Sequence, residues 1–413
     1  MALIGMQDTS LSSNETYNRQ SYFPALCSLG VLYFLMGFIT CLNDSLVPYF
    51  RNRFNLSYAD SSLVQFYFFL TYGIVSIPSG RLVSRIGYRT GITLGFCITA
   101  AGAILFIPAT LLDNYNYFLV ALFVMAVGVV LLQVTANPYA AILGPAHKAS
   151  SRLTLLQAIG SIGTTVAPIV GTAFLLSSKN VMDSNLPIQI QYAVIALVLV
   201  LIAYVVSRLS MPELNNNVSY DTNGEFSLIG NPSLLFGVIG IFMYVGAEVS
   251  IGTFLTNYIS DTLQIGVDDA NFFVAIYWGS MIVGRILGAY LLNSCRPALM
   301  LIFCSFTSII LILLSLATKG EIAVWSMALI GLFNSVLFAI VFSLSIKGLG
   351  KYANRASGYL STAIVGGAIV TYLQGYVKDR YNWEMAYMIP AFCYLYLLAF
   401  GIYQIKLIFK DEK

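Results

Sequence analysis

The chain has 413 residues, 58% of them hydrophobic and 9% charged, and its formal net charge is +3. Soluble globular proteins usually carry about 25% charged residues, so the composition excludes a soluble globular protein and favours one with many membrane spans. A charge this small and scattered also excludes nucleic acid as a partner.

Twelve apolar runs follow one another along the chain, and each is long enough to cross a bilayer, which takes about 20 residues in a helix. The runs cover residues 22–50, 61–82, 91–112, 116–143, 153–177, 188–209, 232–260, 270–293, 297–317, 321–348, 356–378 and 384–409. A polar stretch, residues 210–227, separates the first six runs from the last six. The predicted organisation is a tail, a six-helix bundle, a linker, a second six-helix bundle and a short tail, over residues 1–21, 22–209, 210–231, 232–409 and 410–413.

Lysine and arginine residues are unevenly divided between the two sides of the membrane that the twelve predicted spans would cross. Fifteen of the 21 fall on the side of the chain termini, with Arg285 counted among them, and six fall on the other side. Cytoplasmic loops of membrane proteins are enriched in these residues. We therefore expect both tails and the linker to be cytoplasmic.

Two acidic residues lie inside apolar runs. The first run contains Asp44, next to Asn43 in the sequence CLNDSLVPYF, and the seventh run contains Glu248. A carboxylate inside the bilayer costs at least about 2.5–3.5 kcal/mol on insertion scales, unless it faces water, pairs with a cation or takes up a proton. We interpret Asp44 and Glu248 as cation-coupling residues; the alternative is a carboxylate that polar groups hold permanently inside the bundle.

A basic loop follows the second run, in the sequence SGRLVSRIGYRTG. Gly80, Arg85, Gly87 and Arg89 match the pattern G-x-L-x-D-R-x-G-R-R of facilitator proteins, whereas Ser84 stands where that pattern has aspartate. Glycines allow helix ends to approach closely, so we expect a cytoplasmic gating loop. The alternative is a basic loop that only follows the charge bias of cytoplasmic segments.

Amide side chains recur inside the runs, and each offers a hydrogen-bond donor and an acceptor. With aromatic rings nearby, they are typical of a site for a ligand rich in hydroxyl groups, although an amide can also join two helices. The candidate substrate-binding residues are Asn43, Gln65, Gln133, Asn137, Gln157, Asn257, Trp278 and Asn334. The hydroxyls of Ser250 and Thr253 near Glu248 leave open a sodium site, and no other metal site is indicated.

The two halves of the chain also resemble each other. Arg152 precedes Gly163 by eleven residues, as Arg355 precedes Gly366, and the two segments are about 203 residues apart. Two six-helix halves around a site at the middle of the membrane are the plan of the major facilitator fold. The sequence therefore predicts an all-helical membrane protein of that fold.

Several segments resemble the fucose–galactose–hexose symporters of the major facilitator superfamily, over residues 25–405. They include FLMGFITCLNDSLVPYF, LLQVTANPYAAILGP, SSRLTLLQAIGSIGTTVAP and YVGAEVSIGTFLTNYI. The resemblance implies sugar uptake coupled to a cation by alternating access, in the inner membrane of a bacterium. It also implies that Asp44 is the coupling acid.

Two departures from the fucose permeases argue against fucose as the substrate. Gln133 stands where those permeases have glutamate, and Gly160 stands where they have asparagine. The resemblance then favours glucose, galactose or N-acetylglucosamine. Two prolines of the family are replaced by Ala339 and Thr371, which should straighten the tenth and eleventh helices.

The expected function is the cation-coupled import of a hexose, without a cofactor and with the proton as a simpler coupling ion than sodium. We expect a monomer in the lipid bilayer with a small-molecule sugar as its ligand. The alternatives are an L-fucose:proton symporter, a passive sugar facilitator or exporter, and a sugar sensor that does not transport. A membrane enzyme lacks support, because His147 is the single histidine and no Ser/His/Asp set converges.

Overall fold

The computed structural model describes residues 22–44, 54, 58–176, 186–208 and 227–411, and these form helices and short connections. Helices are expected for such apolar runs, because a helix bonds its own backbone groups where water is absent. In chain order the elements are α1 (Tyr22–Asp44), α3 (Tyr58–Leu112), α4 (Tyr115–Ile142), η1 (Ala146–Lys148), α5 (Ala149–Leu176), α6 (Leu186–Arg208), α7 (Pro232–Leu263), α8 (Val267–Leu291), α9 (Pro297–Ala317), α10 (Glu321–Asn334), α11 (Leu337–Ile346), η2 (Gly350–Tyr352), α12 (Ala353–Thr362), η3 (Ala363–Val365), α13 (Gly366–Arg380) and α14 (Trp383–Asp411).

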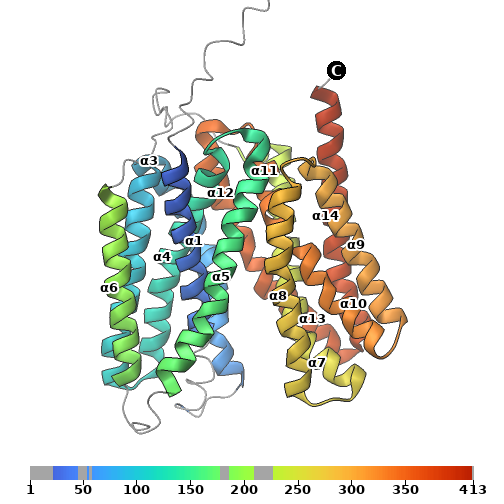
Figure 1. Ribbon diagram of the computed structural model, residues 1–413, viewed down its shortest axis with the longest axis horizontal. Helices are drawn as coiled ribbons and strands as arrows, with labels where there is room; N and C mark the ends of the chain where they lie inside the picture. Colours follow the sequence, from blue (N-terminus) through green and yellow to red (C-terminus); the bar gives the residue numbers. More distant parts are fainter. Residues whose placement is uncertain (1–21, 45–53, 55–57, 177–185, 209–226, 412–413) are drawn as a thin grey trace, which may run out of the picture.

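Nine helical stretches within the described residues are long and apolar enough to cross a membrane, and Ala25–Cys41 forms a shorter apolar helix. The stretch Phe66–Leu112 has 47 residues and turns at Gly87, whose φ of 81° is not helical. α3 therefore crosses the molecule twice, once on each side of Gly87 (Figure 1). The chain is an integral membrane protein, while the count of twelve spans stays a prediction because parts of the chain lie outside the described residues.

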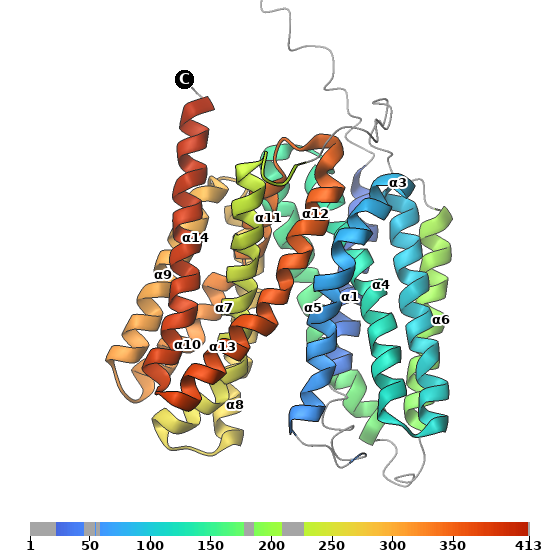
Figure 2. The same cartoon turned by 180° about the vertical axis from the view of Figure 1, so that it is seen from behind.

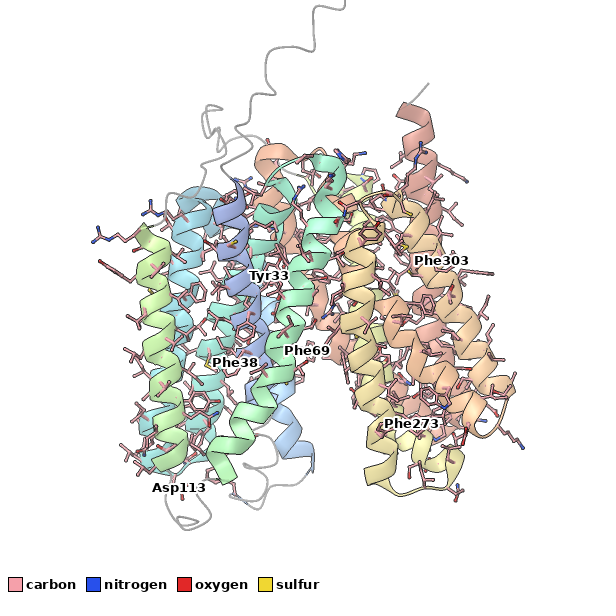
Figure 3. The ribbon with its side chains drawn as sticks, in the orientation of Figure 1. Tyr33, Phe38, Phe69, Asp113, Phe273 and Phe303 are labelled. Carbon is pink, nitrogen blue, oxygen red and sulfur yellow. The ribbon has the colours of Figure 1, made fainter. Side chains whose placement is uncertain are left out.

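The outer helices present apolar side chains to their surroundings. Leu197, Leu201 and Tyr204 of α6 are each more than half exposed, and so is Phe303 of α9. These two helices lie on opposite sides of the molecule (Figure 1), and Phe303 is labelled on α9 in Figure 3. A helix that is apolar on its exposed face is stable in lipid, where such side chains avoid water.

The helices gather into two groups, α1 with α3–α6 and α7 with α8–α14 (Figure 1). α1 begins and α14 ends at the same end of the molecule, where the turn at Gly87 also lies. The two groups approach each other at this end and diverge toward the opposite end, as the view from behind in Figure 2 also shows. We refer to the groups as the first and second halves; the predicted domain limits stay predictions.

The two halves are joined closely at the end where the helices approach each other. The Ser357 hydroxyl of α12 donates a hydrogen bond to the carbonyl oxygen of Val134 of α4, at 2.9 Å. α3 and α12 cross nearby through two glycines, Gly80 and Gly358. A Cβ atom on Gly80 would lie 2.7 Å from the carbonyl oxygen of Asn354, so this crossing requires glycine.

The tenth and eleventh spans are both interrupted. α10 ends at Asn334 and α11 begins three residues later, and the 3-10 turn η3 separates α12 from α13. The expectation that Ala339 and Thr371 would straighten these helices is therefore wrong. Tertiary packing interrupts a helix without proline: after η3, a Cβ atom on Gly367 would lie 2.8 Å from the ring of Phe69 in the other half.

Candidate functional site

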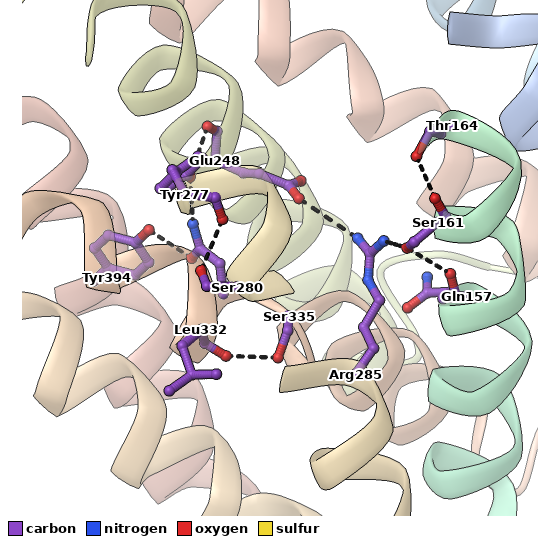
Figure 4. A network of polar contacts seen from close by, with 11 residues as sticks. Gln157, Ser161, Thr164, Glu248, Tyr277, Ser280, Arg285, Leu332, Ser335 and Tyr394 are labelled. Carbon is purple, nitrogen blue, oxygen red and sulfur yellow. Dashed lines mark hydrogen bonds and ion pairs between the residues drawn. The ribbon is translucent and has the colours of Figure 1, made fainter. Parts of the chain in front are cut away.

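A charged pair lies inside the second half, between two neighbouring helices. Glu248 stands at the middle of α7, and Arg285 stands in α8, six residues before its end. The Arg285 Nη2 and Glu248 Oε1 atoms are 3.9 Å apart, and the two side chains are 20% and 13% exposed (Figure 4). The Tyr244 hydroxyl, one turn earlier in α7, also hydrogen-bonds to the Glu248 carboxylate. Because each charge has a partner of opposite sign, the pair is tolerated inside the membrane.

Arg285 also contacts the first half of the molecule. Its Nη1 atom donates a hydrogen bond to the Ser161 hydroxyl of α5, which in turn donates to the carbonyl oxygen of Gln157 at 2.9 Å (Figure 4). The guanidinium therefore lies between Glu248 of its own half and Ser161 of the other. This contact makes Arg285 the point where the charges of the second half meet the polar groups of the first.

Asn334 belongs to a chain of hydrogen bonds that ends at Glu248. The Tyr394 hydroxyl donates to Asn334 Oδ1 at 2.6 Å, and Asn334 Nδ2 donates to the Tyr277 hydroxyl at 2.8 Å. The Tyr277 hydroxyl donates to the backbone carbonyl oxygen of Glu248 at 3.0 Å (Figure 4). Asn334 is fully buried, and both ends of its amide are bonded inside the second half. This residue therefore holds α8, α10 and α14 together and supports α7.

Two amides of α4 are bonded to tyrosines inside the first half. The Tyr33 hydroxyl of α1 donates to Asn137 Oδ1, and the Tyr72 hydroxyl of α3 donates to Gln133 Oε1 at 2.5 Å. Tyr33 lies on the inner part of α1 in Figure 3. Asn137 is fully buried, yet its Nδ2 atom has no hydrogen-bond partner, whereas Gln133 is only partly buried. Each pair joins two helices and leaves part of its hydrogen-bonding capacity unused.

Three predicted site residues cannot be placed. The side chains of Asn43, Asp44 and Gln65 lie outside the described residues; Asn43 and Asp44 are the last two residues of α1, and Gln65 is in α3. Their proposed roles stay predictions.

Asn257 lies away from the charged pair, and Trp278 packs beside α7 one turn after Glu248. Asn257 follows Glu248 by nine residues, about 13 Å along α7, and is exposed in a separate pocket of about 450 Å³ that also contains Asp261 and Trp383. Trp278 is 43% exposed and packs beside Gly252 of α7. The structure therefore brings Gln157 and Glu248 together around Arg285, and leaves Asn257 near one end of the second half.

The hydroxyls considered for a sodium site do not point the same way as Glu248. Ser250 and Thr253 are two and five residues later in α7, so they stand about 200° and 140° around the helix from Glu248. Ser250 is fully buried and bonds to the backbone carbonyl oxygen of Ala247 at 3.3 Å, while Thr253 is exposed. Within the described residues, no group of three or more His, Cys, Asp or Glu side chains converges as a metal site.

Comparison with known proteins identifies the family. A family model described as Major Facilitator Superfamily matches residues 29–372, most of the chain. The chain belongs to the Major Facilitator Superfamily. It is 44% identical to a protein of Brucella abortus biovar 1 (strain 9-941) named glucose/galactose transporter, with 95% of this chain and 98% of that one covered. It is 31% identical to the L-fucose-proton symporter of Escherichia coli (strain K12), with 92% of each covered.

A solved structure of the superfamily supports the same assignment. The crystal structure of the transporter FucP in the outward conformation has a TM-score of 0.85 to this chain at 30% identity, covering 93% of this chain and 99% of that one. The proton:xylose symporter XylE, at 15% identity and a TM-score of 0.71, shows the fold alone. The resemblance to the fucose–galactose–hexose symporters is thus confirmed, and the chain is a transporter rather than an enzyme.

The loop that matches the facilitator pattern turns where the two halves meet. Gly87 adopts a left-handed φ of 81°, which glycine tolerates and other residues rarely do. Arg85 and Arg89 on either side of it are exposed, and the Ser84 hydroxyl donates to the carbonyl oxygen of Arg81 at 2.6 Å. Gly80 lies at the crossing with α12. The gating role of the loop stays a prediction.

Arg285 is the residue that the sequence analysis missed. It was counted among the basic residues of the cytoplasmic side, but it lies within α8 and pairs with Glu248. Without Arg285, fourteen basic residues lie on the side of the chain termini and six on the other side, so the charge bias still predicts cytoplasmic termini. The sequence does contain a feature that points to this pair. Arg285 is an isolated positive charge in the apolar run 270–293, and Glu248 is an isolated negative charge in the run before it.

Proposed function

We propose that this transporter imports a hexose such as glucose, galactose or N-acetylglucosamine together with a cation, and that the cation is a proton rather than sodium. The choice of hexose rests on one observation: identity is 44% to the relative named glucose/galactose transporter, against 31% to the one named L-fucose-proton symporter. An L-fucose:proton symporter and a passive sugar facilitator are the alternatives.

The polar groups between the halves support a site for a sugar. Gln133 and Asn137 lie on α4 and Gln157 lies on α5 of the first half, and Arg285 of the second half contacts α5 through Ser161. Amides and a guanidinium offer both donors and acceptors to a ligand rich in hydroxyl groups. In this proposal the sugar binds between the two halves.

Alternating access follows from the arrangement of the halves. They approach each other at the end where the chain termini lie and diverge at the other end (Figure 1). With cytoplasmic termini, as the charge bias predicts, the divergent end faces the outside of a bacterial inner membrane. The similarity to FucP in its outward conformation supports this assignment. Rocking one half against the other would then expose the bound sugar to the inside.

Coupling requires an acidic residue that binds and releases the cation. Glu248 already has a positive partner in Arg285, so the proton is assigned to Asp44, with Glu248 acting through that partner. Ser250 and Thr253 stand about 200° and 140° around α7 from Glu248, so the three side chains diverge, which favours the proton over sodium. We treat the protein as a monomer.

Uptake of radiolabelled sugars into proteoliposomes tests the proposal. Glucose, galactose, N-acetylglucosamine and fucose are compared while a pH gradient or a sodium gradient is imposed separately. We expect glucose or galactose to accumulate under the pH gradient alone. Equilibration without accumulation under either gradient would reject symport and favour a passive facilitator.

The variant Asp44→Asn separates coupling from binding. Removing the titratable group should abolish accumulation against a gradient and leave counterflow exchange of sugar largely intact, because exchange does not require net proton movement. Simultaneous loss of accumulation and exchange, in a protein that still folds, would show that Asp44 has a structural or sugar-binding role instead.

A further inference from the structure

Within the described part of the chain, fifteen buried side-chain atoms have no hydrogen-bond partner, and two of them belong to residues at the charged pair. One is Nε of Arg285 in the second half, a donor, and the other is Oε1 of Gln157 in the first half, an acceptor. Buried groups of this kind are nearly always bonded in proteins, because leaving one unbonded is costly. These two lie on residues at one contact between the halves, so a single ligand group bound there would satisfy both.

The two atoms are brought together by Ser161. Gln157 and Ser161 are four residues apart and so lie on the same side of α5, about 6 Å from each other. Ser161 is bonded to the Arg285 guanidinium, and Figure 4 shows the Gln157 side chain extending from α5 toward Arg285. The two residues that carry the unbonded donor and the unbonded acceptor thus lie at the same contact between the halves.

A hydroxyl group has the chemistry that this pair requires. It can accept a hydrogen bond from the charged Nε–H group and donate one to the amide oxygen, whereas a carboxylate cannot donate and an ammonium cannot accept. Water shares this property, so the experiment must distinguish a bound water from a sugar hydroxyl.

We propose that Arg285 and Gln157 together bind one hydroxyl group of the transported sugar. The inference rests on the proposed sugar transport and adds a residue and a contact to it. Glu248 is a positioning residue here: its Oε1 atom lies 3.9 Å from Arg285 Nη2 and neutralises the guanidinium. Since one hydroxyl contacts both halves, sugar binding favours arrangements in which Gln157 and Arg285 remain close.

The substitution Arg285→Lys isolates this contact from the charge pair. Lysine keeps the positive charge opposite Glu248 but lacks the planar guanidinium and its Nε donor. Gln157→Leu removes the acceptor without changing any charge, and Arg208→Lys, at the exposed end of α6, is the matched control. Thermal unfolding of each purified full-length protein verifies that it is folded.

Equilibrium binding is measured with radiolabelled D-glucose and D-galactose, and competition with their monodeoxy derivatives tests each hydroxyl. We expect one derivative to bind wild type about 10–100-fold more weakly than the parent sugar, since a hydrogen bond to a charged group is lost. Arg285→Lys should bind the parent sugar more weakly by a similar factor and should no longer distinguish it from that derivative. Gln157→Leu should show the same loss of discrimination, and Arg208→Lys should behave as wild type.

The other outcomes overturn the inference in distinguishable ways. If wild type binds the sugars and both site variants bind them equally well, the pair does not contact the substrate. If the variants weaken binding but still discriminate every derivative as wild type does, the pair holds a water or supports the helices. If wild type binds none of the sugars, the proposed function fails and the inference fails with it.

Discussion

Three buried amides of this transporter, Asn334 in the second half and Asn137 and Gln157 in the first, use their polar atoms differently. In the second half, Asn334 is bonded at both ends, and the chain of contacts leads without a gap to the charged residue Glu248. In the first half, Asn137 and Gln157 each keep one buried atom without a partner. The hydrogen-bond chain through Asn334 is therefore complete, whereas Asn137 keeps a donor unused and Gln157 keeps an acceptor unused.

Amide side chains therefore have different roles in the two places. A fully bonded amide such as Asn334 contributes to stability, because its removal leaves buried hydroxyls without partners. An amide with an unused atom, such as Gln157, can still bind a ligand. Substitution of Asn334 should therefore affect folding more, and substitution of Gln157 should affect transport more.

The largest effect is expected for Glu248→Gln. The substitution leaves Arg285 charged and partly buried without a counterion, so the free energy of unfolding should fall by about 3–5 kcal/mol. Transport should be lost as well, because the guanidinium loses the carboxylate that neutralises it and fixes its position. Chemical unfolding in detergent measures the first effect and proteoliposome uptake the second. The double variant Glu248→Gln/Arg285→Gln should regain much of the stability without regaining transport; equal instability of single and double variants would contradict the pairing.

A smaller loss of stability is expected for Asn334→Leu. The Tyr394 hydroxyl then has no acceptor and the Tyr277 hydroxyl loses a donor, which should cost about 2–3 kcal/mol. Tyr394→Phe together with Asn334→Leu should be less destabilising than additivity predicts, because the hydroxyl left unbonded by the first change is gone. Strict additivity in unfolding measurements would show that the hydrogen-bond chain does not act as one unit.

The smallest change in stability is expected for Tyr33→Phe in the first half. It removes the donor to Asn137 Oδ1 and should cost about 1 kcal/mol. Asn137 then has a second unsatisfied atom, so the concentration dependence of sugar uptake should change more than the unfolding does. Tyr396→Phe, whose hydroxyl donates to the backbone of Phe236 at the surface, is a control. A larger effect of Tyr33→Phe on unfolding than that of Asn334→Leu would reverse the comparison between the halves.

The broken spans illustrate where local reasoning about sequence fails. Ala339 and Thr371 replace prolines, and local propensity predicts straight helices there. The helices are nevertheless interrupted, and just after the second break Gly367 allows α13 to pack against Phe69 of α3 in the other half, a contact between residues about 300 positions apart. No local pattern reports such a contact.

The sequence by itself determined the membrane class, the helical fold, the family and the presence of isolated charges in apolar runs, because hydrophobic length and motif spacing are local properties of the chain. The tertiary structure decided which polar side chains meet. It placed Arg285 against Glu248 and Ser161, and it separated Asn257 from the charged pair. Charge–charge and hydrogen-bond contacts depend on distances of a few ångströms, and those distances are set by how helices far apart in the chain pack together.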